Sequence, residues 1–305
     1  MLEKFQGRLP WQRKNKRLQN PVMMRTVQPN YRDRISVTTW MIVFGLGLST
    51  LFQLENTIRW DFMAITPVSI RMTEQGIAAL FLAILAAAGA QSVVVVHPRL
   101  SSRNRSNLRT WPFWALPMAL TMITALLLPY VPSQPFLVFV LLLFGVLIAL
   151  ALFCLYATVE SGQPGYRRSR LVLNALTYGA ALLLFAFVYQ TRTRSLLSSS
   201  IIAITATFLA VEMLRNTTDR PELVFTYSAI VGLILGQVTW ALNYMAQVPD
   251  LTGGLLLLLI FYLTAGIAQQ GLQERITPRV LWEFVIFTVV ALVLMALLGP
   301  GFQIG

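Results

Sequence analysis

The chain has 305 residues, of which 56% are hydrophobic and only 12% are charged, and its formal net charge is +12. Soluble globular domains carry roughly 25% charged residues, so this composition leaves too little polar surface to cover a water-soluble globule and excludes that class. The solvent that such a chain fits is lipid. The positive charges stand between apolar runs, which indicates orientation in a membrane rather than binding to nucleic acid.

The first 34 residues are polar and basic, with nine Lys and Arg residues, and three prolines interrupt them. A cleaved secretory signal would place its apolar stretch earlier in the chain. We therefore expect the first apolar run to remain in the protein and to direct it to the membrane. Residues 1–34 are predicted to form a flexible cytoplasmic tail, and its basic side chains favour anionic headgroups of the lipid bilayer as partners.

Nine apolar runs follow. In hydrocarbon such runs should be helices, because backbone polar groups need partners within the segment, and about 20 residues cross a bilayer. The predicted spans are residues 35–54, 77–96, 113–131, 136–158, 171–189, 196–214, 223–244, 251–269 and 281–298. The expected fold is an all-α integral membrane bundle within residues 35–299, followed by a short tail at 300–305. The span at 196–214 is the weakest, because three consecutive serines stand near its start. Pro117 is expected to bend or locally unwind the third span.

Basic residues are divided unequally between the two faces that nine spans define. Arg59, Arg71, Arg192 and Arg194 fall on one face, and the other 20 of the 24 Lys and Arg residues fall on the face of the N-terminal tail. Cytoplasmic loops of membrane proteins are enriched in Lys and Arg. The sequence therefore predicts a cytoplasmic N-terminus and an extracytoplasmic C-terminus, as a multi-pass protein of the bacterial inner (plasma) membrane.

Residues with catalytic or metal-binding chemistry are scarce. None of the 12 acidic residues, and no Lys or Arg, lies at the middle of a predicted span, which argues against transport driven by a charged relay. The single histidine, His97, and the single cysteine, Cys154, are far apart in the sequence, and a zinc site needs more such ligands. His97 is expected at the level of the lipid headgroups. We expect no catalytic residue, no metal and no cofactor.

The seventh predicted span carries small residues at helical spacing. Gly232 and Gly236 are four residues apart, a spacing that lets two helices approach closely. Ala79, Ala83 and Ala87 repeat this pattern in the second span. Both sets are predicted to be helix-packing seams, and for the glycine set a ligand-facing surface is the alternative.

Polar and aromatic side chains accompany these glycines, and one acidic residue ends the sixth span. An amide in hydrocarbon requires a partner across a helix interface or a polar ligand. The candidate ligand- or partner-facing residues are Gln237, Trp240, Asn243, Tyr244 and Glu212. Glu212 is also expected to pair with Arg215, and Glu283 with Arg279, since residues three or four apart are neighbours on a helix.

The longest predicted outer loop, residues 55–76, holds the only dense charge cluster on its face. Its candidate recognition residues are Glu55, Arg59, Trp60, Asp61, Arg71 and Glu74. Loops carry function more often than their share of residues would suggest. The stretch at residues 58–65 is expected either to be a solvated loop or to lie on, or re-enter, the membrane.

Three functions remain open. The uncharged interior, the seams and the lack of a catalytic set favour a non-enzymatic scaffold, assembly factor or accessory subunit of a membrane complex. The alternative is a transporter or flippase of a neutral or amphipathic small molecule or lipid, with Gln237, Trp240, Asn243 and Tyr244 along its path. A membrane enzyme that acts on a lipid-linked substrate through the 55–76 loop comes third.

Overall fold

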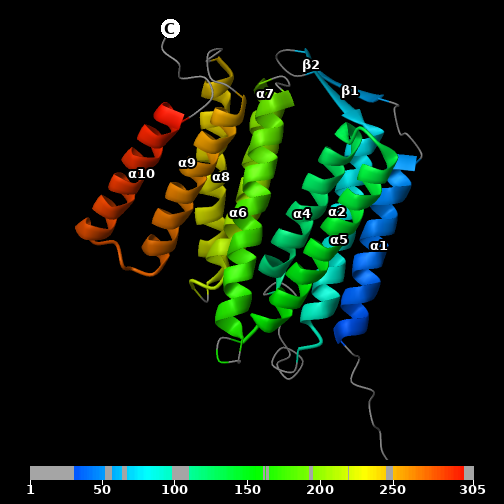
Figure 1. The fold of residues 1–305 in the computed structure, drawn as a ribbon, viewed down its shortest axis with the longest axis horizontal. Helices are drawn as coiled ribbons and strands as arrows, with labels where there is room; N and C mark the ends of the chain where they lie inside the picture. The colour runs from blue at the N-terminus through cyan, green and yellow to red at the C-terminus, as the bar shows by residue number, and fades with distance from the viewer. Residues whose placement is uncertain are drawn as a thin grey trace, which may run out of the picture.

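The protein is a helical bundle with one small hairpin (Figure 1). The computed structural model describes residues 31–51, 57–63, 67–97, 110–160, 162, 165–191, 195–218, 220–244 and 250–298. The helices are α1 (Tyr31–Leu51), α2 (Glu74–Val94), η3 (Trp111–Trp114), α4 (Ala115–Leu127), η4 (Leu128–Tyr130), α5 (Gln134–Ala157), α6 (Tyr166–Thr191), α7 (Ser195–Leu214), α8 (Pro221–Tyr244), α9 (Asp250–Leu272) and α10 (Pro278–Leu298). Each predicted span overlaps one of these helices or, for the third, the run from η3 to η4.

Within the described ranges, seven helical segments are long and apolar enough to cross a membrane. They are Tyr31–Leu51, Gly76–Val94, Trp111–Tyr130, Gln134–Ala157, Tyr166–Tyr189, Pro221–Tyr244 and Leu251–Leu272. A shorter apolar helix, Ser198–Leu214, forms most of α7. The predicted class, a multi-pass helical membrane protein, is confirmed.

Proline marks several helix starts, where its missing N–H costs little. Pro221 begins α8 and Pro278 begins α10. Pro117 lies in the first turn of α4 rather than inside a long helix, and the turn before it, η3, is a 3-10 helix. The local unwinding expected near Pro117 is thus present, but as a tightened first turn.

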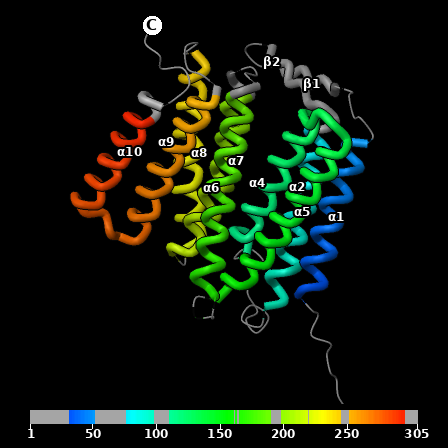
Figure 2. Tube along the Cα trace, viewed as in Figure 1, coloured from blue at the N-terminus to red at the C-terminus, as the bar shows by residue number. Residues whose placement is uncertain are grey.

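The helices form two neighbouring groups. On one side α1 packs against α2 and α5, and α2 packs against α4; on the other side α7 packs against α8, and α6 packs against α9 (Figures 1 and 2). The third span joins the groups, because α4 contacts both α6 and α7 and most of its side chains are buried. α10 lies at the edge of the bundle against α9, where the Tyr262 ring meets the rings of Phe284 and Phe287.

The connection between α1 and α2 contains two antiparallel strands, β1 (Thr57–Met63) and β2 (Pro67–Thr73). The sequence interpretation allowed only helices and an irregular loop, so this hairpin corrects it. The signal was available: in β1 the apolar Ile58, Trp60 and Phe62 alternate with Arg59 and Asp61, which is the two-residue period of a strand. The hairpin lies at the end of the bundle where α1 finishes (Figure 1).

The opposite end of the bundle is rich in arginine, and we refer to it as the basic end. It is the end where α1 and α6 begin and where α5 and α7 finish (Figure 1). Arg32 and Arg34 stand in the first turn of α1, and Arg167, Arg168 and Arg170 stand in the first turns of α6. The Arg34 guanidinium donates a hydrogen bond of 3.0 Å to the Ser92 carbonyl, near the end of α2.

Candidate functional site

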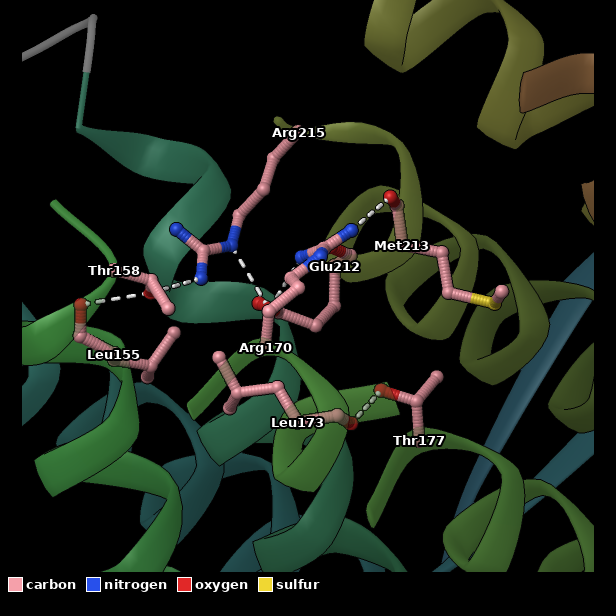
Figure 3. A network of polar contacts seen from close by, with 8 residues as sticks. All are labelled: Leu155, Thr158, Arg170, Leu173, Thr177, Glu212, Met213 and Arg215. Atoms are coloured by element: carbon pink, nitrogen blue, oxygen red, sulfur yellow. Dashed lines mark hydrogen bonds and ion pairs between the residues drawn. The ribbon is translucent and has the colours of Figure 1, made fainter. Parts of the chain in front are cut away.

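Four polar side chains meet at the basic end, and we call them the buried arginine network: Thr158, Arg170, Glu212 and Arg215 (Figure 3). Glu212 has no exposed surface, and Nε of Arg215 lies 2.8 Å from its Oε1. Nη1 of Arg170 lies 3.5 Å from the same oxygen. The predicted Glu212–Arg215 pair is therefore confirmed, and the structure adds a second arginine and a threonine that the sequence did not indicate.

Helix ends explain why these residues converge. Arg170, at the start of α6, donates hydrogen bonds to the carbonyls of Glu212, at 3.1 Å, and Met213. Carbonyls in the last turn of a helix have no partner within the helix, and a cation near the C-terminus also complements the helix dipole. Nη2 of Arg215 donates a 2.7 Å hydrogen bond to the Thr158 hydroxyl just beyond α5. The network therefore ties together the ends of α5, α6 and α7.

The third span joins this network through an aromatic contact. The guanidinium of Arg215 lies 4.3 Å from the centroid of the Phe113 ring in η3, a geometry in which the ring face attracts a cation. Two arginines and one carboxylate leave one positive charge in excess. Oε2 of Glu212 and Nη1 of Arg215 are buried without a hydrogen-bond partner. The arrangement suits electrostatic joining of helix ends.

The predicted glycine seam is the contact between α7 and α8, which is the most extensive helix pair in the described part of the chain. A Cβ at Gly232 would overlap the Thr207 hydroxyl and would lie 2.5 Å from the Ala203 carbonyl oxygen. A Cβ at Gly236 would lie 3.0 Å from the Ala203 Cβ. At both glycines α8 therefore approaches α7 too closely for a side chain to fit without movement.

The alanines of the second span are buried as well. Ala79, Ala83 and Ala87 are at most 8% exposed. Their helix, α2, packs against α1 and α4, and the predicted seam character of this face agrees with that position. The same helix meets α1 closely at Gly45, where a Cβ would overlap the Leu82 side chain.

Three of the four other residues singled out in the seventh span lie away from the α7 contact. Gln237, Trp240 and Tyr244 are exposed, and the Trp240 and Tyr244 rings meet edge to face at 5.3 Å. Asn243 is half-buried and donates a 2.8 Å hydrogen bond to the Ser198 hydroxyl of α7. The structure therefore separates Asn243, which joins two helices, from the three side chains that point away from the bundle.

These three side chains belong to a continuous exposed strip, which we call the α8 outer face. It consists of Ile230, Leu233, Gln237, Trp240 and Tyr244. The spacing of three or four residues places them on one side of a helix. No described residue makes a hydrogen bond to the Gln237 amide.

The residues proposed in the outer loop fall in the hairpin and at its borders. Arg59 stands directly opposite Arg71 in the strand register, and Asp61 stands opposite Ser69. Trp60 lies between Arg59 and Asp61 in β1. Glu74 is the first residue of α2, and Glu55 lies outside the described residues. The hairpin register thus brings Arg59 and Arg71 together although they are distant in sequence.

The single histidine and the single cysteine are both buried. His97 is only 2% exposed, so it is more enclosed than the expected headgroup position, and its ring meets Tyr156 edge to face at 5.0 Å. Tyr156 stacks in turn on Tyr31 at 4.2 Å. Cys154 is a free buried thiol. In the part of the chain that the structure describes, no group of three or more His, Cys, Asp and Glu side chains could hold a metal ion.

Comparison with known proteins places most of the chain in a described protein family. The model of a protein family described as protein of unknown function (DUF5656) matches residues 54–298. No curated protein and no solved structure matches the chain. The matched region contains the hairpin, the buried arginine network and the α8 outer face.

Proposed function

The chain belongs to the DUF5656 family, and we propose that it is a non-enzymatic subunit of a membrane complex that binds a partner through the α8 outer face. The partner in this proposal is a transmembrane helix of another protein. The proposal rests on one observation: the Gln237 side chain, which ends in a polar amide, is exposed on the outside of the bundle.

We further propose that the chain crosses the bacterial inner membrane nine times, with the N-terminus in the cytoplasm. The positions of α7 and α10 at two of the predicted spans support this count. The gathering of arginines at the end where α1 begins supports the orientation, because Lys and Arg are enriched on the cytoplasmic side.

The depth of Gln237 makes its exposure costly in lipid. The α8 helix has 24 residues, so Gln237 lies four to five residues past its middle, or about 7 Å along the axis. The hydrocarbon extends about 15 Å to either side of the midplane. An amide at that depth has no water to bond, and burial of an unpaired amide in an apolar medium costs about 1–3 kcal/mol by mutational measures.

A polar side chain on a neighbouring transmembrane helix would satisfy this amide. Hydrogen bonds between transmembrane helices contribute about 0.6–2 kcal/mol each, and the Trp240 and Tyr244 rings beside Gln237 add apolar contact area. We therefore propose that the partner helix presents Asn, Gln, Ser or Thr at the depth of Gln237. Its apolar side chains would contact Leu233 and Ile230.

This placement weakens the transport alternative. That hypothesis relied on Gln237, Trp240, Asn243 and Tyr244 as the lining of a path. Three of them face away from the bundle and the fourth bonds to α7, so they do not surround a route between the helices.

Site-directed photocrosslinking in native membranes tests the proposal. A photoreactive phenylalanine analogue at Leu233, one turn from Gln237, is expected to form a discrete protein adduct with one transmembrane partner. The matched control places the analogue at Leu143, which is also exposed but lies on α5. Only lipid adducts are expected there.

A second substitution tests the role of the amide. Gln237→Leu should reduce the Leu233 adduct several-fold, because it removes the polar contact, whereas Gln237→Asn should retain much of it. Adducts only with lipid at Leu233, or a protein adduct unchanged by Gln237→Leu, would contradict the proposal.

A further inference from the structure

A groove on the outside of the bundle separates α1 from α5, which lie side by side in Figure 2. Its volume is about 440 Å³, within the range of about 300–1,000 Å³ that is typical of small-molecule sites. We call it the α1–α5 groove. It is lined by Arg32, Ile35, Ser36, Thr39, Trp40, Val43, Leu142, Gly145, Val146, Ala149 and Phe153.

Small residues create the groove. Ser36 and Thr39 on α1 face Gly145 and Ala149 on α5, so the helix surfaces are hollowed there. Gly145 also fixes how close the helices come, since a Cβ at that position would lie 2.7 Å from Cγ2 of Val43. The result is a furrow whose walls include exposed large side chains.

The groove has the depth of one lipid leaflet. Along α1 it runs from Arg32 to Val43, and the 11 helical steps between them rise about 16 Å. Half of the hydrocarbon thickness is about 15 Å. On α5 the lining residues run from Phe153, near the basic end, to Leu142 in the middle of the helix. The groove therefore extends from the membrane surface at the basic end to the bilayer centre.

The lining of the groove becomes less polar from the basic end towards the middle of the helices. A phospholipid changes in the same direction, from its charged headgroup to its apolar acyl chains. Arg32 stands at the surface end, and its only described hydrogen bond is a 3.4 Å contact from Nε to the Tyr31 hydroxyl. No carboxylate among the described residues forms an ion pair with it. The Ser36 and Thr39 hydroxyls follow, and Oγ1 of Thr39 is buried without a hydrogen-bond partner. The deep end holds apolar side chains only.

We propose that the α1–α5 groove binds one anionic phospholipid of the leaflet at the basic end. An acyl chain fills the groove beside Trp40 and Val146, and the headgroup phosphate pairs with Arg32. The charge of Arg32 selects an anionic headgroup over a zwitterionic one. The site is independent of the α8 outer face, so each proposal can fail without the other.

Photoactivatable lipids test the site. The full-length protein is reconstituted in vesicles of phosphatidylcholine and phosphatidylglycerol in equal amounts, with a diazirine on the acyl chain of one lipid or the other. Phosphatidylglycerol is expected to label groove residues, Trp40 and Val146 among them, about fivefold more than phosphatidylcholine does. This ratio corresponds to about 1 kcal/mol for one basic group near the surface.

Two substitutions test binding of the headgroup and binding of the acyl chain separately. Arg32→Gln should bring phosphatidylglycerol labelling of the groove down to the phosphatidylcholine level, whereas Arg168→Gln, an exposed arginine of α6 at the same end, should leave it unchanged. Ala149→Phe should abolish groove labelling by filling the hollow while labelling of exposed α10 residues persists. Ser36→Leu fills the same hollow from α1 and replaces Ala149→Phe if that protein does not fold.

Equal labelling by the two lipids, or labelling unaffected by Arg32→Gln, would overturn the anionic-lipid assignment. Labelling of the groove that survives both filling variants would overturn the site itself.

Discussion

Glu212 is the most enclosed charge that the structure describes, and its surroundings determine what its loss would do. Two guanidinium groups face its Oε1, at 2.8 and 3.5 Å. A buried ion pair contributes little compared with a well-packed apolar pair, but removal of one partner leaves the other charged and buried, at a cost of about 3–5 kcal/mol. The network is therefore sensitive to neutralisation of its single carboxylate.

We predict that Glu212→Gln lowers the free energy of unfolding by about 3–5 kcal/mol, because Arg215 and Arg170 would then lack a counter-charge. Unfolding of the purified protein by a denaturing detergent would measure it. The matched control is Glu283→Gln, whose partner Arg279 lies 3.6 Å away in an exposed pair. Exposed pairs contribute about 0–1 kcal/mol, so equal losses for the two variants would contradict the structural role of the network.

Residue-level expectations were met where they depended on local spacing. The Glu212–Arg215 pair could be predicted because three residues separate its members. Arg170 and Thr158 could not, since 42 and 57 residues separate them from the groups they contact, and the contacts depend on how three helix ends converge. For the same reason the sequence could not show that Gln237 and Gly236, which are adjacent, face different surroundings.

Among elements, the α7–α8 pair shows how small residues control helix approach. The Gly232 backbone lies against Thr207 and the Ala203 carbonyl, and a main-chain oxygen cannot move aside as a flexible side chain can. Gly254 of α9 forms a similar contact with α6, where a Cβ would lie 2.7 Å from the Ala186 Cα. The second contact was not predicted, although two consecutive glycines in the eighth apolar run were a signal for it.

Gly232→Ala is predicted to destabilise the protein by about 1–3 kcal/mol, the usual cost of overpacking, because α8 must move away from α7. Gly179→Ala is the matched control: Gly179 also lies within a helix, α6, and nothing is within 4 Å of the added Cβ. Glycine inside a helix is less favourable than alanine, so that variant should be at least as stable as the parent. Thermal unfolding in mild detergent would compare them, and similar midpoints for both variants would show that the seam tolerates a methyl group.

The positions of the helices could be predicted well because hydrocarbon imposes one solution on a long apolar run. The hairpin could not be anticipated by that reasoning, because it lies between two spans, and its alternating pattern is short. The sixth span seemed marginal for a reason that the structure explains. α7 packs against α4, α6, α8 and α9, and of its three consecutive serines Ser198 is buried and accepts the hydrogen bond from Asn243.

At the scale of the whole molecule, the number of crossings sets the side on which the chain ends. If α7 and α10 both cross, the count is odd and the C-terminus lies outside the cytoplasm. We predict that alkaline phosphatase fused after Gly305 is active, and that a fluorescent protein fused there, which folds only in the cytoplasm, is dark. A fusion after Asn216, between α7 and α8, should give the reverse result. A cytoplasmic C-terminus would refute the nine-span topology.

The charged residues of the buried arginine network are synthesised in a fixed order, which determines when each gains a partner. During synthesis Arg170 is made 42 residues before Glu212, so α6 enters the membrane while its guanidinium still lacks a carboxylate. Glu212 is followed by Arg215 in the next turn, so the acid emerges together with its own counter-charge. When α7 arrives it supplies the anion that Arg170 lacks, and α5, α6 and α7 can then join at their ends.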